Sequence, residues 1–213
     1  MRIEEKRTRK VRSDKRRDVK PVVDLELYDC IARISYITNS WMKDVGELLC
    51  KNGLYSKKVI DHLSKDFRRD YRFDNTFYIG NPDIVSERAR KKSGTTKRLT
   101  IRFLQDTYDD LADLAYSLDV TVSTAASILL HASIRDTDII NEYISNFVED
   151  SLDPNRKKQL QLVLEYTQKE NPYPNDEVTL AQLISYIMDE FMGQSRNIKK
   201  AVETWLDRFI DKD

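Results

Sequence analysis

Polar residues able to bond nucleobases occupy alternate positions in the stretch KRLTIRF, residues 97–103. Successive side chains of a β-strand point to opposite faces, so one face would carry Arg98, Thr100 and Arg102. The other face would hold the apolar side chains of Leu99, Ile101 and Phe103. Arginine can donate two parallel hydrogen bonds to guanine, and threonine can donate, accept or touch a thymine methyl group. A basic alternating strand can also be an edge strand whose cations discourage aggregation.

The charge distribution favours a polyanionic partner. The chain has 36 Lys and Arg against 36 Asp and Glu, a formal net charge of 0. Residues 1–20 nevertheless carry ten basic against four acidic residues, and residues 86–102 carry seven against one. Residues 137–213 carry nine against fifteen. Positive charge gathered in two segments indicates an electrostatic footprint for a polyanion such as DNA, whereas a basic tail can also be merely solvated.

Two amphipathic helices are expected directly after this strand. In TYDDLADLAYSLDV (107–120), apolar residues recur every three or four positions, which is typical of a helix with one buried face. In TVSTAASILLHASI (121–134), Thr121 or Ser123 can cap a second helix. The predicted order is strand, helix, short turn and helix.

The same order occurs earlier, at an offset of 80 residues. The stretch 27–49 aligns on 107–129 without a gap, and Tyr28 matches Tyr108 while Asp29 matches Asp109. We interpret this as an internal repeat. At this offset the first copy's strand carries Asp18, Lys20, Pro21 and Val22 where the second copy has Arg98, Thr100, Ile101 and Arg102. An acid and a valine are poor base readers, so we expect the first copy to serve pairing or backbone contact.

Residues 97–130, KRLTIRFLQDTYDDLADLAYSLDVTVSTAASILL, resemble the ribbon-helix-helix DNA-binding family (the MetJ and Arc type), and residues 20–50 resemble it less closely. The resemblance implies two paired strands lying in the major groove as an antiparallel ribbon. Base contacts would come from Arg98, Thr100 and Arg102. Phosphate contacts would come from Lys97, Thr121, Ser123, Lys15, Arg16, Arg17 and Lys20. Thr121 and Ser123 can equally be simple helix caps.

The predicted fold class is mostly α, with tandem ribbon-helix-helix units followed by a C-terminal all-helical domain. Residues 56–71 read as a helix, the stretch from Asn75 to Thr96 as a linker, and four more helical patterns follow residue 136. The last of these carries an apolar stripe from Ile198 to Ile210. We therefore expect five segments: a basic flexible arm over 1–17, the first copy over 18–55, a helix and linker over 56–96, the second copy over 97–135 and the C-terminal domain over 136–213.

Enzymatic function is not indicated. The chain has no phosphate loop, nucleophile elbow or HExxH motif, and its carboxylates are scattered. We expect no cofactor and no metal, because Cys30 and Cys50 lack ligand spacing and His62 and His131 stand singly on helices. No stretch reaches the roughly 18–20 apolar residues of a membrane span, so a cytoplasmic, nucleoid- or plasmid-associated protein is expected.

The resemblance implies a prokaryotic, sequence-specific binder of double-stranded DNA. Typical functions are transcriptional repression, plasmid partition, toxin neutralisation or marking an origin of transfer beside a relaxase in conjugation. We expect an origin-of-transfer accessory factor (part of a relaxosome) or a repressor, forming a homo-oligomer and contacting a relaxase or another mobile-element protein through its C-terminal domain. The alternative is an interaction scaffold or antitoxin-like protein whose repeated units serve only dimerisation. The target sequence, and whether the copies pair within or between chains, stay open.

Overall fold

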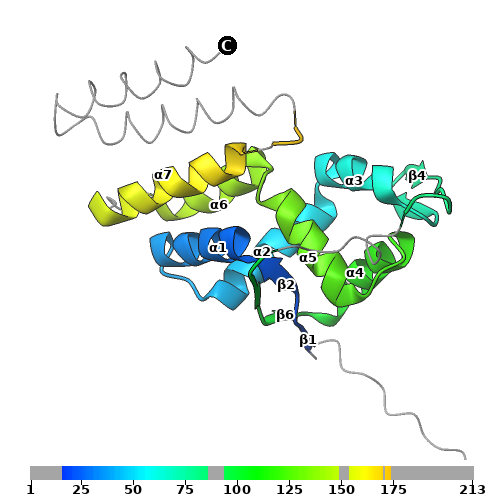
Figure 1. The fold of residues 1–213 in the computed structure, drawn as a ribbon, viewed down its shortest axis with the longest axis horizontal. Helices are drawn as coiled ribbons and strands as arrows, with labels where there is room; N and C mark the ends of the chain where they lie inside the picture. Colours follow the sequence, from blue (N-terminus) through cyan, green and yellow to red (C-terminus); the bar gives the residue numbers. More distant parts are fainter. Residues whose placement is uncertain (1–15, 86–93, 149–153, 170, 174–213) are drawn as a thin grey trace, which may run out of the picture. The chain divides into compact units, whose positions relative to one another are not determined.

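The computed structural model describes residues 16–85, 94–148, 154–169 and 171–173. These residues are mostly helical, as expected, with a few short antiparallel strand pairs (Figure 1). The chain divides into two compact units, described separately below: Met1–Ala32 with Ser40–Ser133, and Arg33–Asn39 with Ile134–Asp213. Lys15 and the helical patterns after residue 173 lie outside the described residues. In the part of the chain that the structure describes, no single helix is long and apolar enough to cross a membrane.

Strands from the two copies form an antiparallel ribbon in the first unit. β1 (Arg17–Val19) pairs with β6 (Ile101–Phe103), and β2 (Val22–Asp24) pairs with β5 (Thr96–Arg98). The two strand pairs contain six pairs of facing residues, and the two residue numbers of each pair add up to 120. The two strand pairs therefore continue one antiparallel ribbon without a shift in register. Between them the Leu99 amide donates to the Pro21 carbonyl oxygen at 3.0 Å. Proline has no amide proton to donate in return, which interrupts the ladder there.

Buried and exposed side chains alternate along both strands of this ribbon. The buried side chains are Val19, Pro21, Val23, Leu99, Ile101 and Phe103. The exposed side chains are Asp18, Lys20, Val22, Arg98, Thr100 and Arg102. Burial of one face against helices stabilises a strand pair that would be marginal alone. The alternation expected between Arg98, Thr100 and Arg102 on one face and Leu99, Ile101 and Phe103 on the other is therefore present.

Two helices follow each half of the ribbon, at matching positions. α1 (Leu25–Ile37) and α2 (Met42–Tyr55) follow β2, and α4 (Gln105–Ser117) and α5 (Val122–Ser133) follow β6. α4 begins and ends 80 residues after α1, and α5 begins 80 residues after α2. The turns between the helices also match, because Asn39 (φ 50°) and Asp119 (φ 54°) are again 80 residues apart. Both adopt the left-handed conformation, which Asn and Asp tolerate better than most other residues with a side chain.

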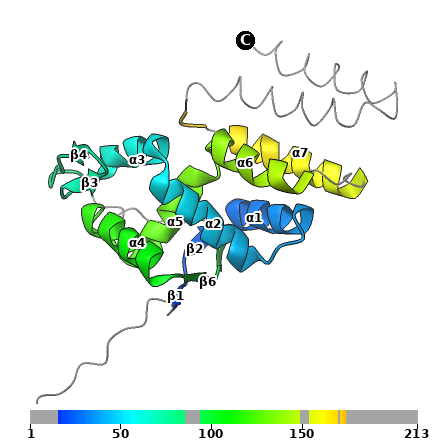
Figure 2. The ribbon, with the colours of Figure 1, turned by 180° about the vertical axis from the view of Figure 1, so that it is seen from behind.

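Close packing of α2 on α5 joins the two copies. A Cβ atom added at Gly53 would lie 1.9 Å from Ser133 Oγ, so the helices can approach this closely only with glycine there. A Cβ atom at Gly46 would lie 2.9 Å from Ile101 Cδ1, which places α2 directly over β6. Figures 1 and 2 show α2, α5 and the ribbon side by side from both directions.

The first unit therefore has an approximate two-fold relation between its copies. At the 80-residue offset Gly53 corresponds to Ser133, and these two residues contact each other across the helix pair. The ribbon register likewise sets Lys20 opposite its own counterpart, Thr100. An axis relating two copies must pass where residues meet their own counterparts. The strands of the two copies thus pair within one chain, which answers a question that the sequence left open.

The segment between the copies differs from its prediction. The helix expected over 56–71 ends early: α3 (Lys57–Leu63) gives way to the 3₁₀ turn η1 (Ser64–Asp66). A hairpin follows, with β3 (Tyr71–Phe73) paired to β4 (Thr76–Tyr78), where a linker from Asn75 was expected. Phe67 is buried. The centre of its ring lies 5.1 Å from the centre of the Tyr71 ring and 5.9 Å from that of the Tyr78 ring. This aromatic cluster stabilises a hairpin whose strands are too short to show a sequence period.

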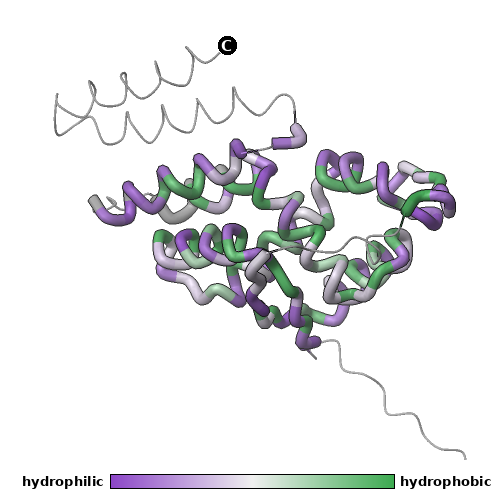
Figure 3. Tube along the Cα trace, in the orientation of Figure 1, coloured by the Kyte–Doolittle hydropathy of each residue, from purple (hydrophilic) through white to green (hydrophobic). Residues whose placement is uncertain are grey.

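The second unit contains α6 (Thr137–Val148) and α7 (Pro154–Gln168), which correspond to the first two of the four helices expected after residue 136. Hydrophilic and hydrophobic stretches follow one another along α7 (Figure 3). The second unit also contains residues 33–39, the end of α1, which the sequence did not predict. Arg33 donates to Gln159 Oε1 at 2.7 Å, and the Arg156 guanidinium lies 5.8 Å from the Tyr36 ring. The unit's core includes Ile34, Ile37, Ile140, Ile144, Leu160, Val163 and Leu164.

Candidate nucleic-acid interface

The outer face of the ribbon brings the expected base-contacting residues together. Cross-strand neighbours form three rungs, which are Asp18 with Arg102, Lys20 with Thr100, and Val22 with Arg98. Four of the six side chains can donate hydrogen bonds, and three of these carry positive charge. Directly opposite residues in an antiparallel pair lie close enough for their side chains to interact. The face is therefore a short, exposed, mainly basic strip rather than a set of isolated side chains.

One rung contains an ion pair that the sequence did not reveal. Arg102 Nε lies 2.9 Å from Asp18 Oδ1, and the side chains remain 58% and 48% exposed. This contact is made through Nε, so the two terminal nitrogens of Arg102 can still donate hydrogen bonds to another group. At the 80-residue offset Asp18 corresponds to Arg98, so sequence comparison placed these residues in equivalent positions rather than in contact. Only the pairing register shows that Asp18 meets Arg102.

Basic residues beside the ribbon contact aromatic rings of the opposite copy. Lys97 Nζ lies 4.5 Å from the centre of the Tyr28 ring, and the Arg17 guanidinium lies 5.6 Å from that of Tyr108. Both the cations and the tyrosines are related by the 80-residue offset, so the two contacts are symmetric equivalents. Cation–π contacts of this kind hold a charged group in place without neutralising it. The expected phosphate-contacting residues Lys97 and Arg17 are thus fixed at matching positions.

An open hollow of about 520 Å³ lies at the β1–β6 end of the ribbon. It is lined by Arg16, Arg17, Asp18, Arg102 and Tyr108. Arg16 Nη1 also contacts Glu47 Oε2 at 3.0 Å, and Arg17 Nε donates to Gln105 Oε1 at 3.0 Å. Three guanidinium groups against one lining carboxylate give this end of the ribbon a net positive lining.

The start of α5 adjoins the ribbon. Thr121 Oγ1 accepts from the Thr124 amide at 3.2 Å, so Thr121 acts as the helix cap. Ser123 Oγ donates to the Lys20 carbonyl oxygen at 2.5 Å, and Ser127 Oγ donates to the Val22 carbonyl oxygen at 2.8 Å. The Ser123 hydroxyl proton is therefore used within the protein. A phosphate at this helix end would be held by the first backbone amides and the positive helix end instead.

Sequence reasoning missed Lys43 at the corresponding position of the first copy. Lys43 lies 80 residues before Ser123, in the first turn of α2, and is exposed. Its Nζ lies 5.8 Å from the centre of the Trp41 ring, and that side chain is 74% exposed. The offset of the repeat, applied to the candidate Ser123, would have identified it.

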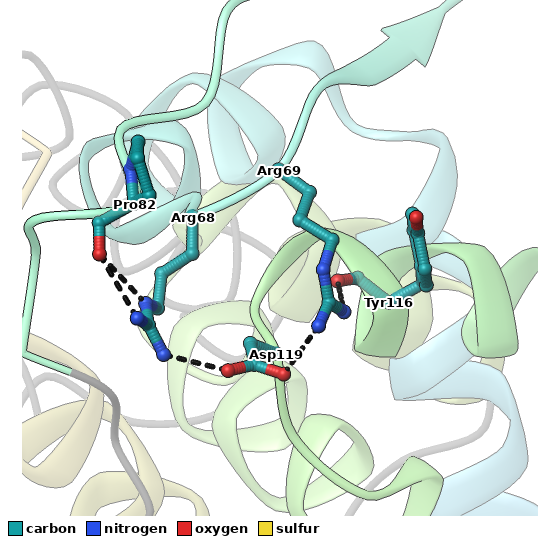
Figure 4. Close-up of polar contacts among 5 residues, drawn as sticks. All are labelled: Arg68, Arg69, Pro82, Tyr116 and Asp119. Carbon is teal, nitrogen blue, oxygen red and sulfur yellow. Dashed lines mark hydrogen bonds and ion pairs between the residues drawn. The ribbon is translucent and has the colours of Figure 1, made fainter.

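Another arginine cluster lies at the turn between α4 and α5 (Figure 4). Arg68 Nη1 and Arg69 Nη2 contact the two carboxylate oxygens of Asp119 at 2.6 and 2.8 Å. Arg68 also donates to the Pro82 carbonyl oxygen at 2.9 Å, and Arg69 donates to that of Tyr116 at 2.9 Å. Both guanidinium groups are thus occupied within the protein. We interpret this cluster as the anchor of the hairpin segment on the second copy.

Both cysteines, Cys30 and Cys50, are buried. Burial raises the pKa of the Cys50 thiol, which disfavours the reactive thiolate. Within the same residues, no group of three or more His, Cys, Asp or Glu side chains could hold a metal ion. The His131 ring contacts Asp24 at 2.9 Å.

Comparisons with known proteins add no assignment. No protein-family model, no curated protein and no solved structure matches this chain. The interpretation of the interface therefore depends on its residues and geometry.

Proposed function

We propose that this protein binds a specific site in double-stranded DNA by laying its ribbon in the major groove, as a tandem ribbon-helix-helix module within one chain. The observation that carries the proposal is the outer face of the ribbon. Arg98, Thr100 and Arg102 are exposed on a strand whose other face is buried, and they lie beside Lys20 on the paired strand. The major groove admits a two-stranded ribbon, and these side chains match the donors that read base edges there.

Groups around the ribbon support the proposal because they suit the phosphates on either side of a groove. Lys97 and Arg17 lie at equivalent places on the two copies, each against a tyrosine ring. The α5 amides and Lys43 lie at the equivalent starts of α5 and α2. Phosphate contacts at two related positions would fix the register of the ribbon, while the base contacts would provide specificity.

The alternative, a scaffold whose ribbon serves only for dimerisation, is less well supported. Both ribbon strands are supplied by one chain, so the ribbon already has its partner strand. A second chain is therefore not needed to complete the ribbon. For the biological role we infer a repressor or an accessory factor at an origin of transfer, in keeping with the family that the second copy resembles.

The test begins with selection of duplexes from a random pool by the full-length chain. Affinities of the wild type, Arg98→Ala and Arg102→Ala are then measured on the selected site and on random DNA. Each substitution should cost about 1–3 kcal/mol on the selected site and clearly less on random DNA, because removing a base contact removes discrimination. Arg72→Ala is the matched control, since Arg72 is an exposed strand arginine outside the ribbon.

Two outcomes would contradict the proposal. If no sequence is enriched over random DNA, the chain is not a specific binder. If both substitutions weaken specific and random duplexes equally, the arginines supply only charge and the ribbon does not read bases.

A further inference from the structure

The two halves of the ribbon present different chemistry although their backbones are related by a two-fold axis. At the β1–β6 end, Arg102 is paired with a carboxylate, Asp18. At the β2–β5 end, Arg98 stands opposite Val22, which is 38% exposed and offers no acceptor. In the middle, Lys20 stands opposite Thr100, a cation opposite a neutral hydroxyl. Every pair of symmetry-related outer positions thus holds two different residue types.

An inverted-repeat site would match such a face poorly. It would offer the same base edge to Asp18 in one half and to Arg98 in the other, because these residues are equivalent under the two-fold relation. Guanine O6 and N7 are acceptors, so they suit the arginine and repel the carboxylate. A cytosine amino group suits the carboxylate and repels the arginine. The same base edge therefore cannot suit both positions.

The two arginines are also held differently. Asp18 contacts Arg102 through Nε, so the two terminal nitrogens of Arg102 are left to donate to a guanine. The second oxygen of Asp18 can accept from a cytosine amino group beside that guanine. Arg98 has an apolar neighbour instead, and Val22 suits a thymine methyl group.

We infer that the DNA site is directional rather than palindromic. In the half-site under β1 and β6, Arg102 donates to a guanine, and Asp18 accepts a hydrogen bond from a cytosine amino group. In the half-site under β2 and β5, Arg98 donates to a guanine, and Val22 contacts a thymine methyl group. Asp18 is a specificity-determining residue in this arrangement, both directly and as a positioning residue for Arg102. The inference rests on the proposed function, since it concerns the site that the ribbon reads.

The experiment uses the full-length chain and the duplex that it enriches from a random pool. Two further duplexes are made from that site by repeating either half as an inverted repeat. The wild type should bind the original site roughly tenfold or more tightly than either inverted repeat, since each inverted repeat places mismatched base pairs under one half of the ribbon. Equal or tighter binding of an inverted repeat overturns the inference while leaving specific binding intact. If no duplex is preferred over random DNA, the proposed function itself fails.

A transplant makes the test independent of the selected sequence. Asp18→Arg, Lys20→Thr and Val22→Arg together give the first strand the outer residues of the second, and all three positions are exposed. This triple variant should now prefer an inverted repeat in which each half carries both the guanine read by Arg98 and the guanine read by Arg102, with an unfolding midpoint close to that of the wild type. A triple variant that keeps the original directional preference overturns the inference.

Asp18→Asn separates the role of Asp18 from a general structural one. It keeps the size of the side chain, and it should reduce base preference only in the half read by Arg102. Asp18→Glu, which restores the carboxylate, should recover part of that preference. Equal loss of preference in both halves overturns the role assigned to Asp18.

Discussion

At the scale of single residues, Gly53 is the position where the packing of the two copies is tightest. An added Cβ atom would lie 1.9 Å from Ser133 Oγ and 3.0 Å from Leu129 Cδ1. Alanine is the better helix former by about 1 kcal/mol, so Gly53→Ala would be stabilising if there were room. We expect instead a loss of roughly 1–3 kcal/mol in the free energy of unfolding, because the helices must separate to admit the methyl group. Denaturant unfolding measures it.

The two-fold relation supplies the control for this substitution. Ser133 is the counterpart of Gly53, so adding Ser133→Gly to Gly53→Ala moves the small residue to the other helix. The double variant should recover much of the loss, although glycine in α5 retains its own helix penalty. A Gly53→Ala variant as stable as the wild type would show that α2 and α5 do not approach this closely.

At the scale of elements, the hairpin segment depends on one carboxylate for its anchor. Asp119 is 21% exposed in its side chain and contacts both Arg68 and Arg69. Asp119→Asn retains a residue that tolerates the left-handed turn but removes the charge. We expect a loss of about 1–2 kcal/mol in the free energy of unfolding, with faster amide hydrogen exchange at Arg68 and Arg69. Their amides both donate to the Ser117 carbonyl oxygen, at 2.8 and 3.0 Å.

The equivalent turn of the first copy provides the comparison. Asn39 has the same left-handed conformation, so Asn39→Asp changes one charge without changing the turn. It should leave hydrogen exchange in the hairpin unaltered. Equal effects of the two substitutions would show that the turn itself, and not the arginine cluster, determines the stability measured for Asp119→Asn.

The basic arm before the ribbon is expected to act through charge alone. The arm was expected over 1–17, but Arg17 belongs to β1, so the part to remove is residues 1–15, with seven basic and three acidic side chains. Removing them should weaken binding to all duplexes and reduce the dependence of log affinity on log salt concentration, by about 0.9 for each phosphate that the arm neutralises in the full-length chain. Sequence preference should persist, because the outer residues of the ribbon remain. Loss of preference in a titration at several salt concentrations would show instead that the arm reads bases.

Elements long enough to show a repeated pattern of apolar residues could be predicted from the sequence. Elements that depend on contacts between residues far apart in the chain could not. The helices of the second copy and the burial of Leu99, Ile101 and Phe103 follow from local periodicity. The β3–β4 hairpin has three-residue strands, too short for a pattern, and is held by the ring contacts of Phe67. The Asp18–Arg102 ion pair requires the ribbon register, which can be derived from the sequence only once pairing within the chain is assumed.

At the scale of the whole molecule, the end of α1 changes how the C-terminal segment can be tested. Residues 33–39 belong to the second unit, where Arg33 bonds Gln159 and Thr38 Oγ1 lies 3.4 Å from Tyr143 Oη. Removing everything after Arg135 would therefore uncover Ile34 and Ile37, both buried. A loss of DNA binding in that truncation could simply report an unstable α1.

A truncation after Tyr173 tests oligomerisation more cleanly, because it retains α6 and α7. It removes the sequence stripe from Ile198 to Ile210, whose apolar side chains need a partner surface. We propose that this segment joins chains, so that several ribbons occupy repeated sites and avidity rises without new base contacts. The truncated chain should have a lower mass in light scattering, near-normal affinity for a one-site duplex and no cooperativity on a multi-site duplex. Unchanged mass with intact cooperativity would contradict this role and favour docking of another protein, such as a relaxase.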